Sequence, residues 1–305
     1  VAFDKTGTLT HGRPQVTDLV PFGHTTEAQL LEVAAGVESG SSHPLAVAIL
    51  NRAETAGVPA LPARDARALA GRGVVATVGD APAWVTSPRH ASENGGLDEL
   101  GLRQATMFEE QGKTAVAVYR EGIPLGLIAM RDEPRADAAE AVRQLSAMGI
   151  TSTILTGDNP RTAAAIAEGL GMQFQADMMP EDKLSAIREM NEQGGVMMIG
   201  DGINDAPALK QASIGVAMGS GTDVALETAD AAILRDRVTD IAAQIRLARA
   251  AMTNIRQNVT IALGLKVVFL VTTVLGITGL WIAILADTGA TVLVTLNALR
   301  LLGFN

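Results

Sequence analysis

The stretch "GGVMMIGDGIND" (194–205) decides the fold of this 305-residue chain. Its apolar run is too short for a helix and ends at Asp201 and a glycine, as in a buried strand followed by a tight turn. "VAFDKTGTLT" (1–10) and "ITSTILTGD" (150–158) repeat this arrangement. Because amphipathic helical stretches alternate with such strands, the pattern predicts a parallel α/β sheet with helices on both faces. The carboxyl ends of its strands should meet at one ligand-binding edge.

Residues 19–119 interrupt this pattern. Two helical stretches precede three strand-like pieces, "GVVATVG", "PAWVTS" and "TAVAVYR", with Gly- and Pro-rich turns between them. We expect an α+β domain inserted into the parallel-sheet domain, which would comprise residues 1–18 and 120–248. "PLGLIAM" (124–130) is expected to be a strand of the parallel sheet.

Residues 249–305 are predicted to form a two-helix transmembrane hairpin, with helices at about 257–278 and 280–300. Each apolar segment carries one charge, Lys266 in the first and Asp287 in the second. Arginines flank the hairpin, so both of its ends should be cytoplasmic. Two buried core helices are the alternative.

The overall composition excludes some classes of function. A net charge of −9 and a pI near 5.0 argue against a nucleic-acid partner. The absence of cysteine excludes disulfides and thiolate metal ligands within this chain. The chain begins on apolar residues without an initiator Met, from which we expect a fragment of a longer protein.

The strand ends supply the residues for phosphoryl chemistry. Asp4 is the candidate nucleophile, and carboxylates at neighbouring strand ends can share one Mg²⁺. Lys183, in "PEDK", can supply positive charge to a transferring phosphoryl group. The other candidates follow the second and third strands: Thr156, Gly157, Asp158, Asp201, Asn204 and Asp205.

"DKTGTLT", "TGD", "PEDK" and "GDGINDAPAL", in this order, resemble the P-type ATPases, which carry a haloacid-dehalogenase-like phosphorylation domain. The resemblance implies that Asp4 accepts the γ-phosphoryl group of ATP. It implies a Mg²⁺ site at Asp4, the carbonyl of Thr6 and Asp201. Thr156 and Lys183 would contact the phosphoryl oxygens.

The same motifs imply roles for their remaining polar residues. Asn204 and Asp205 would support the metal and its water shell, and Lys5, Gly157 and Asp158 complete the catalytic set. Soluble phosphatases of this superfamily usually carry an acid/base aspartate where this chain has Thr6. The phosphoenzyme should therefore be long-lived.

The inserted domain resembles the nucleotide-binding domain of the heavy-metal branch of these ATPases. In "ESGSSHPLAVAI" (38–49), the resemblance places Glu38 and His43 at the adenine end of ATP. Gly71 and Gly73 of "GRGV" would let the backbone approach the nucleotide. The chain contains no Walker A pattern.

An intramembrane carboxylate is a candidate functional site, and Lys266 is a natural counter-charge for Asp287. Each lies about 10 Å into its helix, so both fall near the middle third of a bilayer. Lys266 and "ADTGAT" (286–291) resemble the zinc, cadmium and lead exporters. Asp287 would then bind the transported metal and Lys266 replace it. A static salt bridge is the alternative.

The resemblance implies ATP-driven export of a divalent heavy metal by a multi-pass protein of the cell or inner membrane. Its partners would be membrane lipid, the metal ion and the remainder of its own pump, namely the actuator domain and earlier membrane helices. A membrane-tethered phosphatase, which Thr6 disfavours, and a non-transporting ATP-binding fragment are the alternatives.

Overall fold

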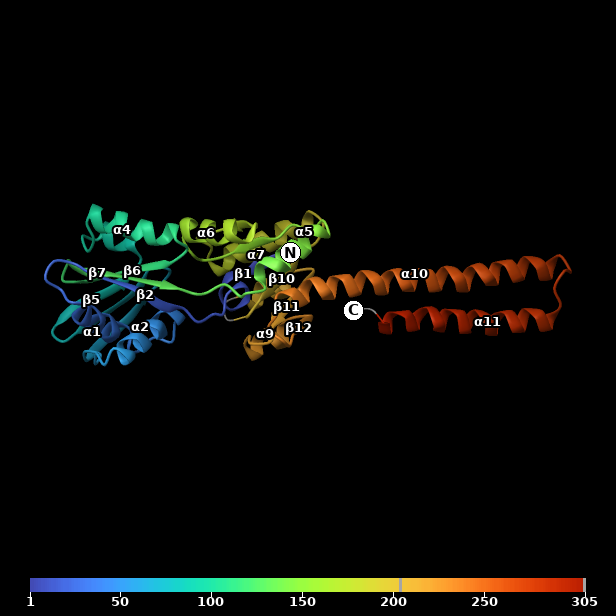
Figure 1. Cartoon of the computed structure of the whole chain (residues 1–305), viewed down its shortest axis with the longest axis horizontal. Helices are drawn as coiled ribbons and strands as arrows, with labels where there is room; N and C mark the ends of the chain where they lie inside the picture. The colour runs from blue at the N-terminus through green and yellow to red at the C-terminus, as the bar shows by residue number, and fades with distance from the viewer. Residues whose placement is uncertain (203–204, 304–305) are drawn as a thin grey trace. The chain divides into compact units, whose positions relative to one another are not determined.

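The computed structural model describes residues 1–202 and 205–303 (Figure 1). The chain divides into two compact units, Val1–Thr239 and Asp240–Asn305. The first unit contains both predicted sheets, and the second contains two long helices.

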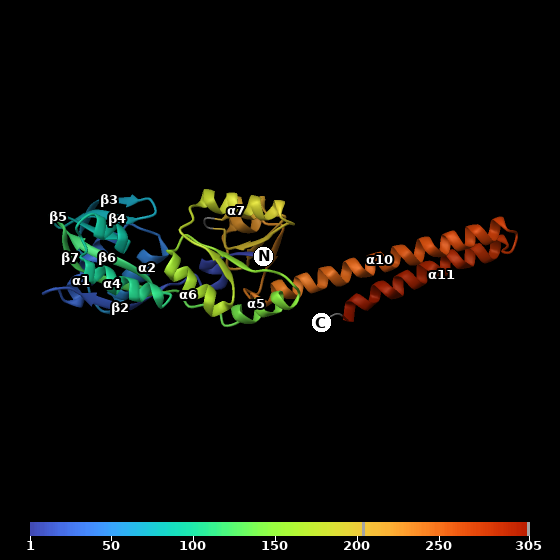
Figure 2. The same cartoon turned by 90° about the horizontal axis from the view of Figure 1, so that it is seen from above.

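The first sheet is parallel, in the order β12-β11-β10-β1-β8-β9. Figure 2 shows α7 on one side of it and α5 and α6 on the other. The predicted parallel α/β fold is therefore confirmed. Its strands are β1 (Ala2–Asp4), β8 (Thr153–Leu155), β9 (Gln173–Gln175), β10 (Met197–Gly200), β11 (Ile214–Met218) and β12 (Ala231–Ile233). Its helices are α5 (Ala138–Ala147), α6 (Pro160–Leu170), α7 (Pro180–Glu192), α8 (Ala206–Gln211) and α9 (Asp223–Thr228).

Local chemistry sets the ends of these helices. In α6, the side chain of Asn159 accepts hydrogen bonds from two backbone N–H groups of the first turn, and Pro160 occupies the first helical position. Gly171 ends the helix with φ of 68°, a conformation that glycine adopts readily. Proline also begins α7, so the loop before each of these helices ends at a defined residue.

The second sheet is antiparallel, in the order β2-β7-β6-β5-β4-β3. Two helices cover each of its faces and form separate apolar cores, α1 and α2 on one side and α3 and α4 on the other (Figure 1). The strands are β2 (Gln15–Pro21), β3 (Ala63–Leu69), β4 (Gly73–Val78), β5 (Ala81–Thr86), β6 (Thr114–Arg120) and β7 (Ile123–Arg131). The helices are α1 (Glu27–Glu38), α2 (Pro44–Thr55), α3 (Pro88–Glu93) and α4 (Glu99–Glu110).

One strand belongs to a different sheet from the one that we expected. Residues 124–130 lie in β7, which pairs with β6 and β2 in the antiparallel sheet. Glu121 and Gly122 both have positive φ, at 52° and 79°, so a two-residue turn folds β7 back onto β6. The inserted sheet accordingly begins at Gln15 and ends at Arg131, outside the limits of 19 and 119.

The second unit contains α10, which runs without a break from Thr239 to Val274, and α11 (Leu280–Leu299). The two helices lie side by side in both views (Figures 1 and 2). Among the described residues, α10 alone is long and apolar enough to cross a membrane, by length and composition; residues 288–303 form a shorter apolar stretch. The first helix was expected at about 257–278, but α10 already begins at Thr239. No proline lies between Thr239 and residue 257, so the helix continues through this segment without a break.

Candidate functional site

Three aspartates meet at the carboxyl edge of the parallel sheet. Asp4 ends β1, Asp201 follows β10, and Asp205 immediately precedes α8. Their carboxylate oxygens lie within 4.8 Å of one another, and all three residues are buried. Because β1 lies between β8 and β10, motifs some 200 residues apart converge at this edge.

The ammonium group of Lys183, from α7, joins this cluster. Its Nζ donates to Asp4 Oδ1 at 2.6 Å and to Asp205 Oδ1 at 2.8 Å. Burial raises the pKa of Asp4 to about 6 despite the opposing effect of Lys183. Burial alone would lower the pKa of Lys183, but the two carboxylates outweigh it and hold that pKa above its ordinary value. Lys183 is therefore a permanent cation beside the candidate nucleophile.

The carboxylate cluster fits a magnesium ion. Three buried carboxylates meet here, two of them paired with Lys183, and carboxylate oxygens are the ligands that Mg²⁺ prefers. The loop after β1 passes so close that a Cβ on Gly7 would lie 2.3 Å from Asp201 Oδ2. With φ of 73°, Gly7 lets the backbone at Thr6 turn directly beneath the cluster.

The second motif lies at the end of the neighbouring strand β8. Thr156 is buried, and its Oγ1 accepts a hydrogen bond from the backbone N–H of Asp158 at 3.1 Å. The carboxylate of Asp158 forms an ion pair with Lys5. Gly157 has the carbonyl oxygen of Met178 3.2 Å from where a Cβ would lie, so a larger residue is disfavoured there. Asn204 lies outside the described residues.

Glu38 is a buried acid at the end of α1. Its Oε2 has no hydrogen-bond partner among the described residues. Burial raises the pKa of Glu38 to about 7, against a smaller lowering by a hydrogen bond with Ser41. Burying an unpaired acceptor is costly, so this oxygen suits a ligand that donates a hydrogen bond.

His43 serves as the N-cap of α2, since its Nδ1 accepts from the backbone N–H of Leu45 at 3.3 Å. Burial lowers its pKa, which favours the neutral ring that this bond requires. Gly71 and Gly73 have φ of 67° and 138°. A Cβ on Gly73 would lie 2.1 Å from the carbonyl oxygen of Val85, so β4 can approach β5 here only with glycine.

Two residues that hold the loop after β1 were not among the sequence-predicted site residues. The guanidinium of buried Arg135 donates to the carbonyl oxygens of Gly7 at 3.1 Å and Thr10 at 3.1 Å. Asp132 accepts from the Thr10 hydroxyl at 2.5 Å and from the backbone N–H of Gly12 at 3.1 Å. The signal was the charged run "RDEPRADA" directly after a strand, which sequence alone does not distinguish from a solvated loop.

In the second unit, Lys266 lies in α10 and the backbone of Asp287 lies in α11. The side chain of Asp287 is outside the part that the structure describes.

A family model for haloacid dehalogenase-like hydrolases matches residues 1–213. The chain covers 87% of a solved catalytic domain of the CPx-ATPase CopB-B, at 31% identity over 80% of this chain and a TM-score of 0.63. The chain belongs to the haloacid dehalogenase-like hydrolases, in the heavy-metal branch of the P-type ATPases.

The P-type ATPase relatives include whole pumps. The chain is 54% identical to a zinc/cadmium/lead-transporting P-type ATPase of Escherichia coli over 99% of its length, but it spans 41% of that protein. It is 42% identical to a cadmium-transporting ATPase of Staphylococcus aureus, again over 99% of its length and 43% of the relative. A crystal structure of a zinc-transporting PIB-type ATPase in the E2.Pi state matches with a TM-score of 0.73 and 52% identity, over 99% of this chain and 49% of that one.

Proposed function

We propose that this chain is the ATP-hydrolysing and C-terminal membrane portion of a pump that exports zinc, cadmium or lead. The observation that carries the proposal is the buried cluster at the sheet edge. It places the carboxylate of Asp4 beside the ammonium group of Lys183 and close to two further buried acids, those of Asp201 and Asp205. Such a cluster suits phosphoryl transfer to a carboxylate, because positioned positive charge stabilises the transferred group.

Asp4 is the nucleophile of this reaction. One of its carboxylate oxygens bonds to the γ-phosphorus of ATP as the bond from that phosphorus to the bridging oxygen breaks, so ADP leaves and an aspartyl phosphate forms. Lys183 stays protonated and stabilises the phosphoryl oxygens together with the Thr156 hydroxyl. Asp4, Asp201 and the Thr6 carbonyl would hold Mg²⁺, which would supply positive charge to the phosphate oxygens.

The residues around the nucleophile also govern how long the phosphoenzyme lasts. Thr6 cannot serve as the general acid/base that a soluble phosphatase would use to release the phosphate quickly. Lys5 holds Asp158 by an ion pair, and Asn204 and Asp205 would support the metal and its water shell. The antiparallel domain binds ATP through Glu38, whose Oε2, without a partner among the described residues, can accept a hydrogen bond from the adenine amine.

The hairpin of α10 and α11 spans the membrane within a multi-pass pump of the cell or inner membrane, and both ATP-handling domains are cytoplasmic. Asp287 binds the exported cation, and Lys266 neutralises the carboxylate when the cation has left. The pump also needs an actuator domain and earlier helices from the rest of the protein.

Labelling with γ-³²P-ATP tests the nucleophile. We expect the complete pump to form an acid-stable, hydroxylamine-sensitive phosphoenzyme that Asp4→Asn abolishes. Asp80→Asn, at an exposed turn of the antiparallel domain, is the matched control and should label normally. Label that persists in Asp4→Asn would remove Asp4 from this role.

Substitutions in the hairpin test the metal site. Asp287→Ala should abolish zinc-stimulated ATP hydrolysis by the complete pump, whereas Lys266→Ala should slow dephosphorylation more than metal entry. A static salt bridge predicts instead that each variant loses thermal stability alike and that the double variant recovers stability and transport. Transport by the double variant would refute the metal-site assignment.

A further inference from the structure

A network of amide side chains joins α10 to α11 at the end of the hairpin away from its turn. Asn254 Nδ2 donates to the carbonyl oxygen of Asn297 at 2.6 Å. Asn297 Nδ2 donates to Asn258 Oδ1 at 2.9 Å and to Gln257 Oε1 at 3.3 Å. Asn258 Nδ2 in turn donates to Asn254 Oδ1 at 2.9 Å. We refer to Asn254, Gln257, Asn258 and Asn297 as the amide clamp.

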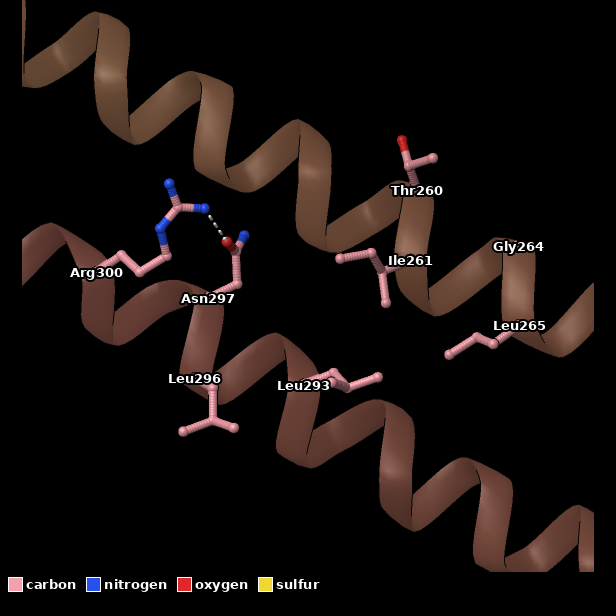
Figure 3. Close-up of a pocket in the computed structure, with 8 residues that line it drawn as sticks. All are labelled: Thr260, Ile261, Gly264, Leu265, Leu293, Leu296, Asn297 and Arg300. Carbon is pink, nitrogen blue, oxygen red and sulfur yellow. Dashed lines mark hydrogen bonds between the residues drawn. The ribbon is translucent and has the colours of Figure 1, made fainter.

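The clamp uses nearly all of the hydrogen-bonding capacity of Asn297. Its side-chain oxygen accepts from Arg300 at 3.1 Å, the bond drawn in Figure 3, while its amide group and its backbone carbonyl face α10. Asn254 is 7% exposed, although most of the surrounding side chains of the hairpin are exposed. A buried amide that is paired through both its nitrogen and its oxygen in one arrangement is costly to unpair, so it favours that arrangement over its alternatives.

The described surface beside the clamp is largely apolar. Between the helices lies a groove of about 580 Å³, lined mainly by Ile261, Gly264, Leu265, Leu293 and Leu296 (Figure 3). Apolar side chains and glycine can pack acceptably when one helix is shifted along the other by several different distances, because dispersion contacts depend little on direction. Among the described residues, the clamp supplies directional hydrogen bonds between the helices at this end.

The clamp fixes which residues of the two helices lie at the same level. Counting ten residues back from Asn297 along α11 reaches Asp287. Counting ten residues forward from 254–258 along α10 reaches 264–268, and the centre of that range is Lys266. Since both helices rise by about 1.5 Å per residue, Lys266 and Asp287 lie at one level, about 15 Å from the clamp.

We propose that the amide clamp sets the register of α10 against α11 and thereby positions Lys266 opposite Asp287. The clamp residues are positioning residues, and they do not themselves bind the metal. A slip of one helical turn would separate the two charged positions by about 5.4 Å along the hairpin, beyond ion-pair contact for fixed helices. The link to metal handling rests on the proposed function, whereas the register itself does not.

Disulfide cross-linking measures the register directly, because the chain contains no cysteine and an introduced pair is the only one present. In the full chain in lipid nanodiscs, Ile261→Cys/Leu293→Cys reports the register of the structure. Leu265→Cys/Leu293→Cys reports a slip of about one turn. We expect the first pair to cross-link well and the second poorly.

Clamp variants then test the proposal. In Asn254→Leu/Asn258→Leu, we expect the ratio of the first cross-link to the second to fall by roughly three- to twentyfold, from loss of the interhelical hydrogen bonds. Thr260→Val/Thr295→Val is the matched control, since each hydroxyl donates to a backbone carbonyl of its own helix, and it should leave the ratio unchanged. An unchanged ratio in the clamp variant overturns the proposal. Loss of both cross-links also overturns it, because the amides would then hold the helices together without selecting a register.

The complete pump supplies the functional readout. The same clamp variant should need a several-fold higher zinc concentration for half-maximal stimulation, with metal-independent ATP binding unchanged. If the wild-type pump showed no zinc stimulation, the proposed function would fail while the cross-linking result still stood. A scrambled register with a normal zinc response would show that the clamp does not position the charged pair.

Discussion

Lys183→Met tests the electrostatics of the catalytic edge. The change keeps a linear side chain and removes the cation between Asp4 and Asp205. The side chains of Lys183, Asp4 and Asp205 are 9%, 9% and 2% exposed, so water cannot replace the lost ammonium group. Breaking a buried ion pair from one side costs about 3–5 kcal/mol. For a unit of this size, that cost lowers the melting temperature by about 6–20 °C.

The size of the loss should depend on pH. Asp4 already has its pKa raised to about 6 by burial, and removing Lys183 raises that pKa further. A carboxyl group whose pKa is higher in the folded than in the unfolded state stabilises the fold at low pH and loses that contribution as pH rises through its folded pKa. We therefore expect a large loss of stability at pH 8 and a smaller one at pH 5, where Asp4 is protonated.

Thermal unfolding followed by circular dichroism, at both pH values, measures this effect in the full chain. Lys210→Met, on the exposed side of α8, is the matched control and should change the melting temperature little. The double variant Asp4→Asn/Lys183→Met should recover part of the loss, because it removes an unpaired carboxylate. Equal losses at pH 5 and pH 8, or no loss at pH 8, would refute the idea that Lys183 compensates buried negative charge.

Two further predictions concern the antiparallel domain. Because burial raises the pKa of Glu38 to about 7, ATP affinity measured by calorimetry should fall as pH drops from 8 to 6, when the carboxylate becomes protonated and its acceptor is lost. Glu38→Gln should bind with little dependence on pH, and a wild-type affinity that does not change over this range would contradict the role of Glu38. Gly73→Ala should destabilise the domain by about 2–4 kcal/mol, because the new Cβ would meet the backbone at 2.1 Å with φ of 138°. Gly40→Ala, with nothing within 4 Å, should be nearly neutral in the same urea titration, and equal costs at the two sites would argue against the close approach.

The sequence by itself determined the parallel sheet and the edge at which its aspartates meet. A short apolar strand ending in an aspartate and a glycine turn is a local signal, and three such strands alternating with amphipathic helices leave few arrangements. Asp4, Asp158 and Asp201 could be found in this way because each lies at the end of its strand or within three residues after it. The two long helices were equally readable, since the length of an apolar run is a property of sequence alone.

Tertiary structure decided which sheet each strand joins and which distant groups meet. An apolar strand such as 124–130 carries the same local pattern in either sheet; its pairing with β6 and β2 was settled by a turn at Glu121 and by partners more than a hundred residues away. The contact of Arg135 with the carbonyl of Gly7 joins residues 128 positions apart. Every residue has a backbone carbonyl that can accept a hydrogen bond, so the type of the accepting residue does not predict such a bond. Only the folded structure shows which carbonyls are used.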